Sequence, residues 1–168
     1  MREDLVFNEV GVLSVEPPVK YVNLEEFYEY FVLSFQNSKT REILYDSFVR
    51  YMTCLRAFVK VNGVLINGSF VTNTLDPNDI DFSVAFDGLS YHRARPEIRK
   101  NIDILLNHSS EFVRNLKCYP YKSFKCYPEW HVLNSITLKK FREAVAFWQK
   151  SRGNIRKGIL FLKFRRGE

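Results

Sequence analysis

Two short apolar stretches on either side of a turn-rich loop constrain the fold of this chain more than any other feature. The first, VLI at 64–66, runs into Asn67-Gly68, which predicts a buried strand followed by a tight turn. The second, IDFSVAF at 80–86, alternates apolar and polar residues, which predicts a strand with one face in the core. The segment between them, TNTLDPND, has the composition of a loop.

Helices are expected before these strands. Asn23 with Glu26 three positions later forms a capping box, which predicts a helix that starts at residue 24. Thr40 is the expected N-cap of a second helix, and Gly63 is its expected stop. The apolar stripe predicted to face the core on this second helix consists of Ile43, Leu44, Phe48, Met52, Leu55 and Val59.

The C-terminal half predicts helices at 96–106 and 111–116 and an extended segment or hairpin at 117–128. A further helix is expected to be capped by Ser135 or Thr137, and a last strand spans 159–164. The residues expected to point inward from that further helix are Leu138, Phe141, Val145 and Trp148.

The predicted fold class is therefore α/β (α+β), with a short mixed β-sheet packed against helices. One domain of 168 residues is expected. It would consist of an extended N-terminal arm at 1–22, a helical part at 23–60, and the sheet, site and C-terminal helix and strand at 63–168.

Charge is distributed unevenly along the chain. Residues 1–113 contain 11 Lys and Arg against 16 Asp and Glu, whereas residues 114–168 contain 14 against 3. Such a basic region is typical of contact with a polyanion, either nucleic acid or the phosphates of a nucleotide. The alternative is a solvated lysine-rich face.

Several other classes of protein are disfavoured. No apolar run approaches the roughly 18 residues of a membrane span, and the N-terminus is acidic, so we expect a cytoplasmic protein without a membrane partner. Cys54, Cys118 and Cys126 match neither a zinc site nor a disulfide framework and are expected to be reduced thiols. The three histidines have no metal-ligand spacing.

The candidate site is the stretch from the Gly-Ser pair to the second strand. Asp79 and Asp81 are expected on one face of a strand with Cβ atoms roughly 6 to 7 Å apart, within reach of one hard cation such as Mg²⁺ or Mn²⁺. Gly68 allows backbone N–H groups to approach a phosphate, Ser69 adds a hydroxyl, and a helix that starts there would point its positive end at the anion. Together these residues indicate a nucleoside-triphosphate site.

The same residues resemble a known signature. Gly68-Ser69 followed ten positions later by Asp79-Ile80-Asp81 is similar to the motif of the polymerase-β-type nucleotidyltransferase superfamily. With FNEVGVLSVEPP, LEEFYEYFV and FWQKSRGNIRKGILFLKF, the chain resembles over nearly its whole length a family of small prokaryotic proteins in that superfamily. The resemblance implies a minimal nucleotidyltransferase fold and Mg²⁺- or Mn²⁺-dependent transfer of a nucleoside monophosphate from an NTP to a hydroxyl on RNA or protein.

The resemblance also assigns roles and partners. Asp79 and Asp81 would be catalytic and hold the metal, and Gly68 and Ser69 would bind the phosphates. Small stand-alone members of the superfamily often belong to toxin–antitoxin or phage-defence modules, which implies a cognate partner protein.

One departure leaves the activity open. The resemblance implies a third carboxylate on a neighbouring strand within 116–127, yet this segment contains Lys117, Lys122 and Lys125 and no acid. The nearest acids that would substitute are Asp103, Glu111 and Glu129. The alternative function is a catalytically inactive module of the same fold that binds RNA, a nucleotide or a protein partner, and a third option is a purely structural interaction protein.

Two basic features bear on binding. Three basic residues in SRGNIRKG, Arg152, Arg156 and Lys157, are expected to clamp a triphosphate or an RNA backbone, and the alternative is a solvated loop. Aromatic residues interleave with the lysines of the 116–130 region and would either stack on bases or fill the core. They are Tyr119, Tyr121, Phe124, Tyr127 and Trp130.

Overall fold

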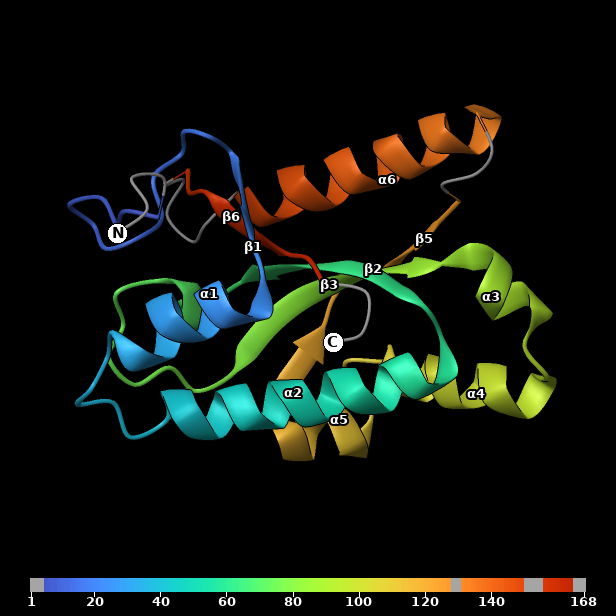
Figure 1. Cartoon of the computed structure of the whole chain (residues 1–168), viewed down its shortest axis with the longest axis horizontal. Coiled ribbons are helices and arrows are strands. Elements are labelled where there is room, and N and C mark those ends of the chain that lie inside the picture. The colour runs from blue at the N-terminus through green and yellow to red at the C-terminus, as the bar shows by residue number, and fades with distance from the viewer. Residues whose placement is uncertain (1–4, 128–130, 150–155, 165–168) are drawn as a thin grey trace.

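The computed structural model describes residues 5–127, 131–149 and 156–164, without the side chains of 131–136. Within these residues a six-stranded mixed sheet lies between two layers of helices (Figure 1). The strands follow the order β1-β6-β2-β3-β4, and β5 also pairs with β3. Their bounds are β1 Val19–Val22, β2 Val61–Asn67, β3 Ile80–Asp87, β4 Cys118–Pro120, β5 Phe124–Cys126 and β6 Ile159–Leu162. The mixed sheet packed on helices confirms the predicted fold class.

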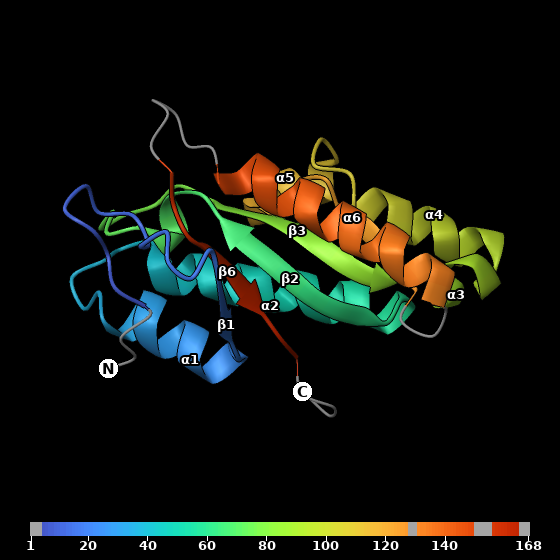
Figure 2. The ribbon, with the colours of Figure 1, turned by 90° about the horizontal axis from the view of Figure 1, so that it is seen from above.

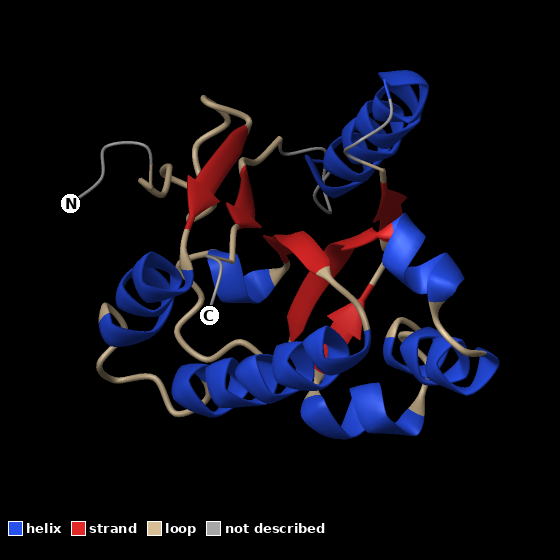
Figure 3. Cartoon of the chain, turned by 45° about the vertical axis from the view of Figure 1, so that its right-hand side comes forward, coloured by secondary structure: helices blue, strands red, loops and turns tan. Residues whose placement is uncertain are grey.

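The two faces of the sheet are covered differently. The helix α6 (His131–Gln149) lies alone over one face, and Figure 2 views the molecule from this side. The helices on the other face and at the end of the sheet appear in Figures 1 and 3. They are α1 (Leu24–Tyr28), which continues as a π-helical turn at Glu29–Leu33, α2 (Arg41–Phe58), α3 (Gly88–Arg93), α4 (Pro96–Leu105) and α5 (Glu111–Leu116).

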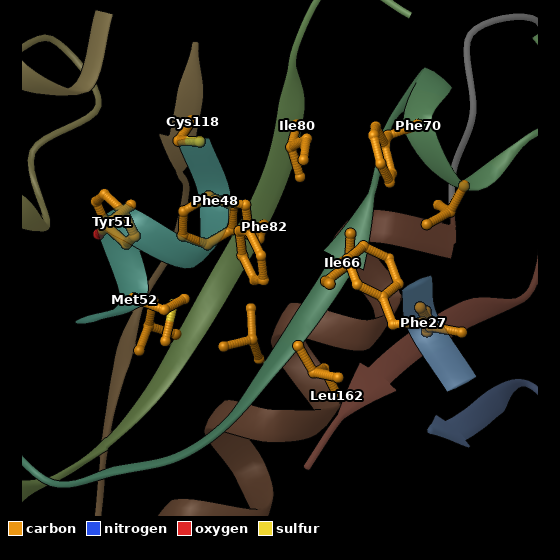
Figure 4. Close-up of a cluster of buried hydrophobic side chains, with 14 of the residues drawn as sticks. Phe27, Phe48, Tyr51, Met52, Ile66, Phe70, Ile80, Phe82, Cys118 and Leu162 are labelled. Carbon is orange, nitrogen blue, oxygen red and sulfur yellow. The ribbon is translucent and has the colours of Figure 1, made fainter. Parts of the chain in front are cut away.

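Alternation along β3 separates two hydrophobic cores. Its residues Ile80 and Phe82 are fully buried in the larger core, under α1 and α2 (Figure 4). Ala85, on the opposite face, belongs to the smaller core beneath α6, together with Phe124 and Ala144. The period of two in IDFSVAF therefore predicted correctly which side chains enter the larger core.

Several boundaries agree with the sequence. The Asn23–Glu26 capping box is present, since each side chain accepts a hydrogen bond from the backbone N–H of the other residue. Helices α4 and α5 and strands β2, β3 and β6 lie where they were expected, within a few residues. The three cysteines are free thiols, as predicted.

Thr40 is the N-cap residue of α2, as predicted, but its side chain makes no capping hydrogen bond, because its hydroxyl donates to the carbonyl of Pro77. The predicted stop of this helix at Gly63 was wrong. The helix ends at Phe58, and Gly63 lies inside β2, where a Cβ atom would come within 2.3 Å of the Phe161 ring. This glycine therefore permits close packing against β6 and does not stop a helix.

Two apolar residues predicted to face the core are exposed. Ile43 is 66% exposed because it precedes Leu44 by one position, about 100° around the helix from the buried stripe. Leu138 is 47% exposed, whereas Phe141, three positions later, packs on the smaller core. The expected caps of α6 were also wrong, since the helix begins at His131 and both Ser135 and Thr137 lie within it.

Of the two alternatives predicted for 117–128, the described residues 117–127 form the extended segment and not the hairpin. Both β4 and β5 pair in parallel with β3, with Cys118 opposite Ile80 and Phe124 opposite Ala85. Lys122, between them, has φ 48°, a left-handed conformation that breaks one edge of the sheet into two short strands. Neither α3 nor the strand β1 within the extended arm was indicated by a local pattern.

One buried cation connects the helical layer to the loop before β3. Arg41 is 1% exposed and donates hydrogen bonds to the carbonyls of Phe31, Phe70, Thr72, Thr74 and Leu75. Its guanidinium also lies 3.6 Å from the ring centroid of Phe35. Burial lowers the pKa of Arg41 to about 10, an effect that the nearby Asp76 opposes, so the side chain remains protonated at neutral pH.

We predict that Arg41→Met lowers the free energy of unfolding by at least about 3 kcal/mol, because buried carbonyls lose a charged donor. Arg41→Lys should fall between Met and wild type, since an ammonium cannot reach five carbonyls. Urea unfolding measures the change, with Arg50→Met, on the exposed side of the same helix, expected within about 0.5 kcal/mol of wild type. Equal effects of the two Met variants would contradict this role.

Candidate functional site

The Gly-Ser turn and the acid pair lie against each other. Gly68 follows β2 with φ 80° and ψ −168°, a conformation that favours glycine. A Cβ atom at Gly68 would lie 2.8 Å from Oδ2 of Asp81, so any larger residue would displace the carboxylate. The contact arises because the last residue of β2, Asn67, pairs with Asp81 in the antiparallel β2–β3 register.

The two aspartates share one face of the central strand. Asp79 immediately precedes β3 and Asp81 is its second residue, while Ile80 between them is buried on the other face. Both aspartates are half-buried, so they border the solvent at the end of the sheet. They lie on the face that α6 covers, because Ala85 on the same face packs beneath α6.

Asn67 supplies a third oxygen beside the pair. It is 2% exposed, and its Nδ2 donates a 2.7 Å hydrogen bond to the carbonyl of Trp148 in α6. Its Oδ1 is buried and has no hydrogen-bond partner in the described part of the chain. This oxygen can accept a hydrogen bond or coordinate a cation, because a carbonyl oxygen carries lone pairs for either.

The expected helix after the turn is shorter than predicted. Ser69 is half-buried and opens a single 3-10 turn, Ser69–Val71, and its carbonyl accepts hydrogen bonds from the backbone and hydroxyl of Thr72. A single turn carries little macrodipole. The anion binding predicted for this turn would therefore depend on the Gly68 backbone and the Ser69 side chain.

The neighbouring strand presents tyrosines to the aspartates. Tyr119 of β4 pairs with Asp81 in the parallel register, and Tyr121 follows on the same face. The pKa of Tyr121 is raised by burial, then by the negative charges of Asp81 and Asp79. Tyr121 therefore lies within electrostatic reach of both carboxylates.

None of the substitute acids seen in the described residues joins the pair. Asp103 accepts a 2.8 Å hydrogen bond from the hydroxyl of Tyr91, on α3 beyond the far end of β3. Glu111 is exposed at the first residue of α5, whose last residue leads into β4. Glu129 lies outside the described residues. Over the described ranges no group of three His, Cys, Asp or Glu side chains is arranged to hold a metal.

Two of the three lysines of 116–127 contact aromatic rings away from the aspartates. The ammonium of Lys122 lies 4.8 Å from the ring centroid of Phe147, and that of Lys125 lies 4.1 Å from the ring centroid of Tyr91. Among the described residues, Lys157 is a cation near the pair. Burial lowers the pKa of Lys157, whereas the negative charge of Asp81 raises it. Lys157, one of the predicted binding residues, therefore lies close enough to Asp81 to interact with it. Arg152 lies outside the described residues.

Fold and site together define a mixed α+β protein with an acid pair and a glycine turn where its two central strands meet. The chain belongs to the family of unknown function DUF6932, whose model matches residues 5–163. No curated protein and no solved structure matches the chain. Among the helices described, none combines the length and the apolar composition needed to cross a membrane.

We predict that Asp81→Asn lowers the pKa of Tyr121, because a nearby negative charge disfavours the tyrosinate. A divalent cation that neutralises Asp79 and Asp81 in the wild type should also lower the pKa of Tyr121. Titration of the tyrosine ¹³Cζ signals by NMR measures both effects. The matched control is Tyr91, whose pKa is raised chiefly by its hydrogen bond to Asp103 and should not move. A Tyr121 signal unchanged by both Asp79→Asn and Asp81→Asn would refute this electrostatic contact.

Proposed function

We propose that this chain is a divalent-cation-dependent nucleotidyltransferase that moves a nucleoside monophosphate from an NTP to a hydroxyl on RNA or on a protein. The observation that carries the proposal is the contact between Gly68 and Asp81. It joins a phosphate-binding turn to an acid pair at the end of one sheet, which is the juxtaposition that a nucleoside triphosphate with a bound cation requires.

The residues present fit Mg²⁺ or Mn²⁺. Asp79, Asp81 and Oδ1 of Asn67 offer oxygen ligands, which these hard cations prefer, and waters would complete the shell. When bound, the cation would neutralise charge that develops on the α-phosphate and the leaving pyrophosphate.

The chain's own residues would bind and orient the triphosphate. Gly68 has no side chain to block a phosphate, and the Ser69 hydroxyl can donate to one. Lys157 would place a cation against the leaving pyrophosphate, and Asp81 favours its charged form despite burial. The acceptor oxygen would form the new bond to the α-phosphorus, the bond to the β-phosphate oxygen would break, and the hydroxyl proton would pass to solvent.

A second candidate rests on the tyrosines. Tyr119 lies in the strand where the resemblance implies a third carboxylate, and Tyr121 follows that strand. The pKa of Tyr121 is raised, so its hydroxyl stays protonated at neutral pH and does not accept a proton. This observation favours a catalytically inactive module that binds RNA, a nucleotide or a protein partner. A cognate partner in a toxin–antitoxin or phage-defence module is compatible with both candidates.

If the enzyme proposal is correct, α-³²P-labelled NTP with Mg²⁺ or Mn²⁺ will label an acceptor in total RNA or cell extract. Asp79→Asn and Asp81→Asn should each reduce labelling by about 100-fold or more, since each removes charge that holds the cation. Asp46→Asn, at an exposed position of α2, is the matched control and should retain wild-type labelling.

The inactive candidate makes the opposite prediction. The wild type would then label no acceptor with any of the four NTPs, and Asp81→Asn would keep the cellular effect of the protein. That pair of results would exclude catalysis by these carboxylates.

A further inference from the structure

A lysine-lined cavity opens on the face of the sheet that carries the acid pair, farther along β3. It has a volume of about 580 Å³ and lies between β5 and α6, with Phe124 and Ala144 at its apolar base. This volume is within the roughly 300 to 1,000 Å³ of small-ligand sites, enough for a nucleotide unit. Neither Asp79 nor Asp81 lines it, so it is distinct from the proposed triphosphate site.

The cavity is predominantly cationic. Three lysines line it, Lys122, Lys125 and Lys140, against one carboxylate, Glu143, which pairs with Lys140 at 3.5 Å. Lys122 is exposed, and Lys140 and Glu143 are both more than half exposed, so the lysines can reach an incoming anion. An excess of positive charge around an apolar base matches a ligand with both phosphates and flat rings.

An exposed aromatic ring adjoins the cavity. Phe147 of α6 is 44% exposed, and the Lys122 ammonium lies 4.8 Å from its ring centroid. The ring centroid of Phe147 lies 5.0 Å from that of Trp148, and the Trp148 centroid lies 5.8 Å from that of Tyr121. Tyr121 is the residue whose pKa is raised by the charges of both aspartates. A continuous run of aromatic rings therefore connects the cavity to the acid pair.

The distance along the sheet between the cavity and the acid pair suits a polymeric ligand and not a single nucleotide. Phe124, at the base of the cavity, pairs with Ala85, four residues along β3 from Asp81. Four residues of strand span roughly 13 Å, which corresponds to about four stacked nucleotides of one strand. A ligand that occupies both places must therefore be a chain.

The backbone of Lys122 supports a binding role. Its φ of 48° is uncommon for a residue with a side chain, and such conformations concentrate at ligand-binding sites. Asparagine adopts this conformation more readily than lysine, so replacement of Lys122 by asparagine removes the charge without straining the backbone.

We propose that this cavity and Phe147 bind a single strand of nucleic acid, with phosphates at Lys122 and Lys140 and a base stacked on Phe147. The strand would lead toward Asp79 and Asp81, which makes it the hydroxyl acceptor. This acceptor role rests on the proposed nucleotidyl transfer, whereas the binding itself does not. An acidic peptide would match the lysines but offers no regular series of rings for Phe147, which favours nucleic acid.

The test is fluorescence anisotropy of labelled 12-nucleotide RNA and DNA strands of one mixed sequence with the full chain. We expect binding whose log K falls linearly with log salt concentration. Lys122→Asn, which keeps the left-handed backbone, and Lys140→Gln should each reduce the magnitude of that slope by about 0.7 for each phosphate that the variant no longer neutralises. Phe147→Ala should weaken binding about fivefold or more without changing the slope. Lys100→Gln, exposed on α4 beneath the other face, is the matched control.

The outcomes separate this inference from the proposed function. Asp81→Asn should still bind the strands. Binding of the strands by a wild-type chain that transfers no label would sustain the inference and reject the enzyme. Tighter binding of the RNA strand or of the DNA strand would show which kind of nucleic acid the cavity binds. Absence of binding, or binding that responds to Lys100→Gln as much as to Lys122→Asn and Lys140→Gln, would overturn the inference.

Discussion

The placement of the whole site depends on one buried guanidinium. Arg41 donates to carbonyls from the π-helical turn and from the loop between the Gly-Ser turn and β3. A loop that leaves β2 and returns to β3 needs its carbonyls satisfied away from water, and the planar guanidinium supplies enough donors for several at once. The loop is thus held to α2, and the acid pair begins where it ends.

The site itself results from pairing two antiparallel strands at their ends. The β2–β3 register sets Asn67 opposite Asp81, and the next residue, Gly68, then meets the carboxylate directly. Because a shift by one residue would turn both aspartates into the core, burial of Ile80 and Phe82 on the other face fixes the register. The packing of the larger core therefore also sets the geometry of the site.

The two faces of the sheet differ in their role: one provides stability, and the other carries the candidate site. Beneath β3, the larger core provides stability through fully buried aromatic residues such as Phe48 and Phe82, whose ring centroids are 5.4 Å apart. The face under α6 carries the aspartates, the tyrosines and the lysine-lined cavity, and its smaller core leaves room for them. Chemistry and charge are thus concentrated where fewer apolar contacts are needed.

The sequence alone determined the local features. Alternation in IDFSVAF fixed the shared face of Asp79 and Asp81, and the Asn23 and Glu26 side chains fixed the start of α1, because both patterns depend only on neighbours along the chain. Tertiary structure decided the rest. Three features depend on residues that are distant in sequence. They are the burial of Arg41, the positions of Asn67 and Tyr121 next to the acid pair, and the packing of Gly63 on Phe161. Their partners are chosen by strand order and helix packing, which no local spacing encodes.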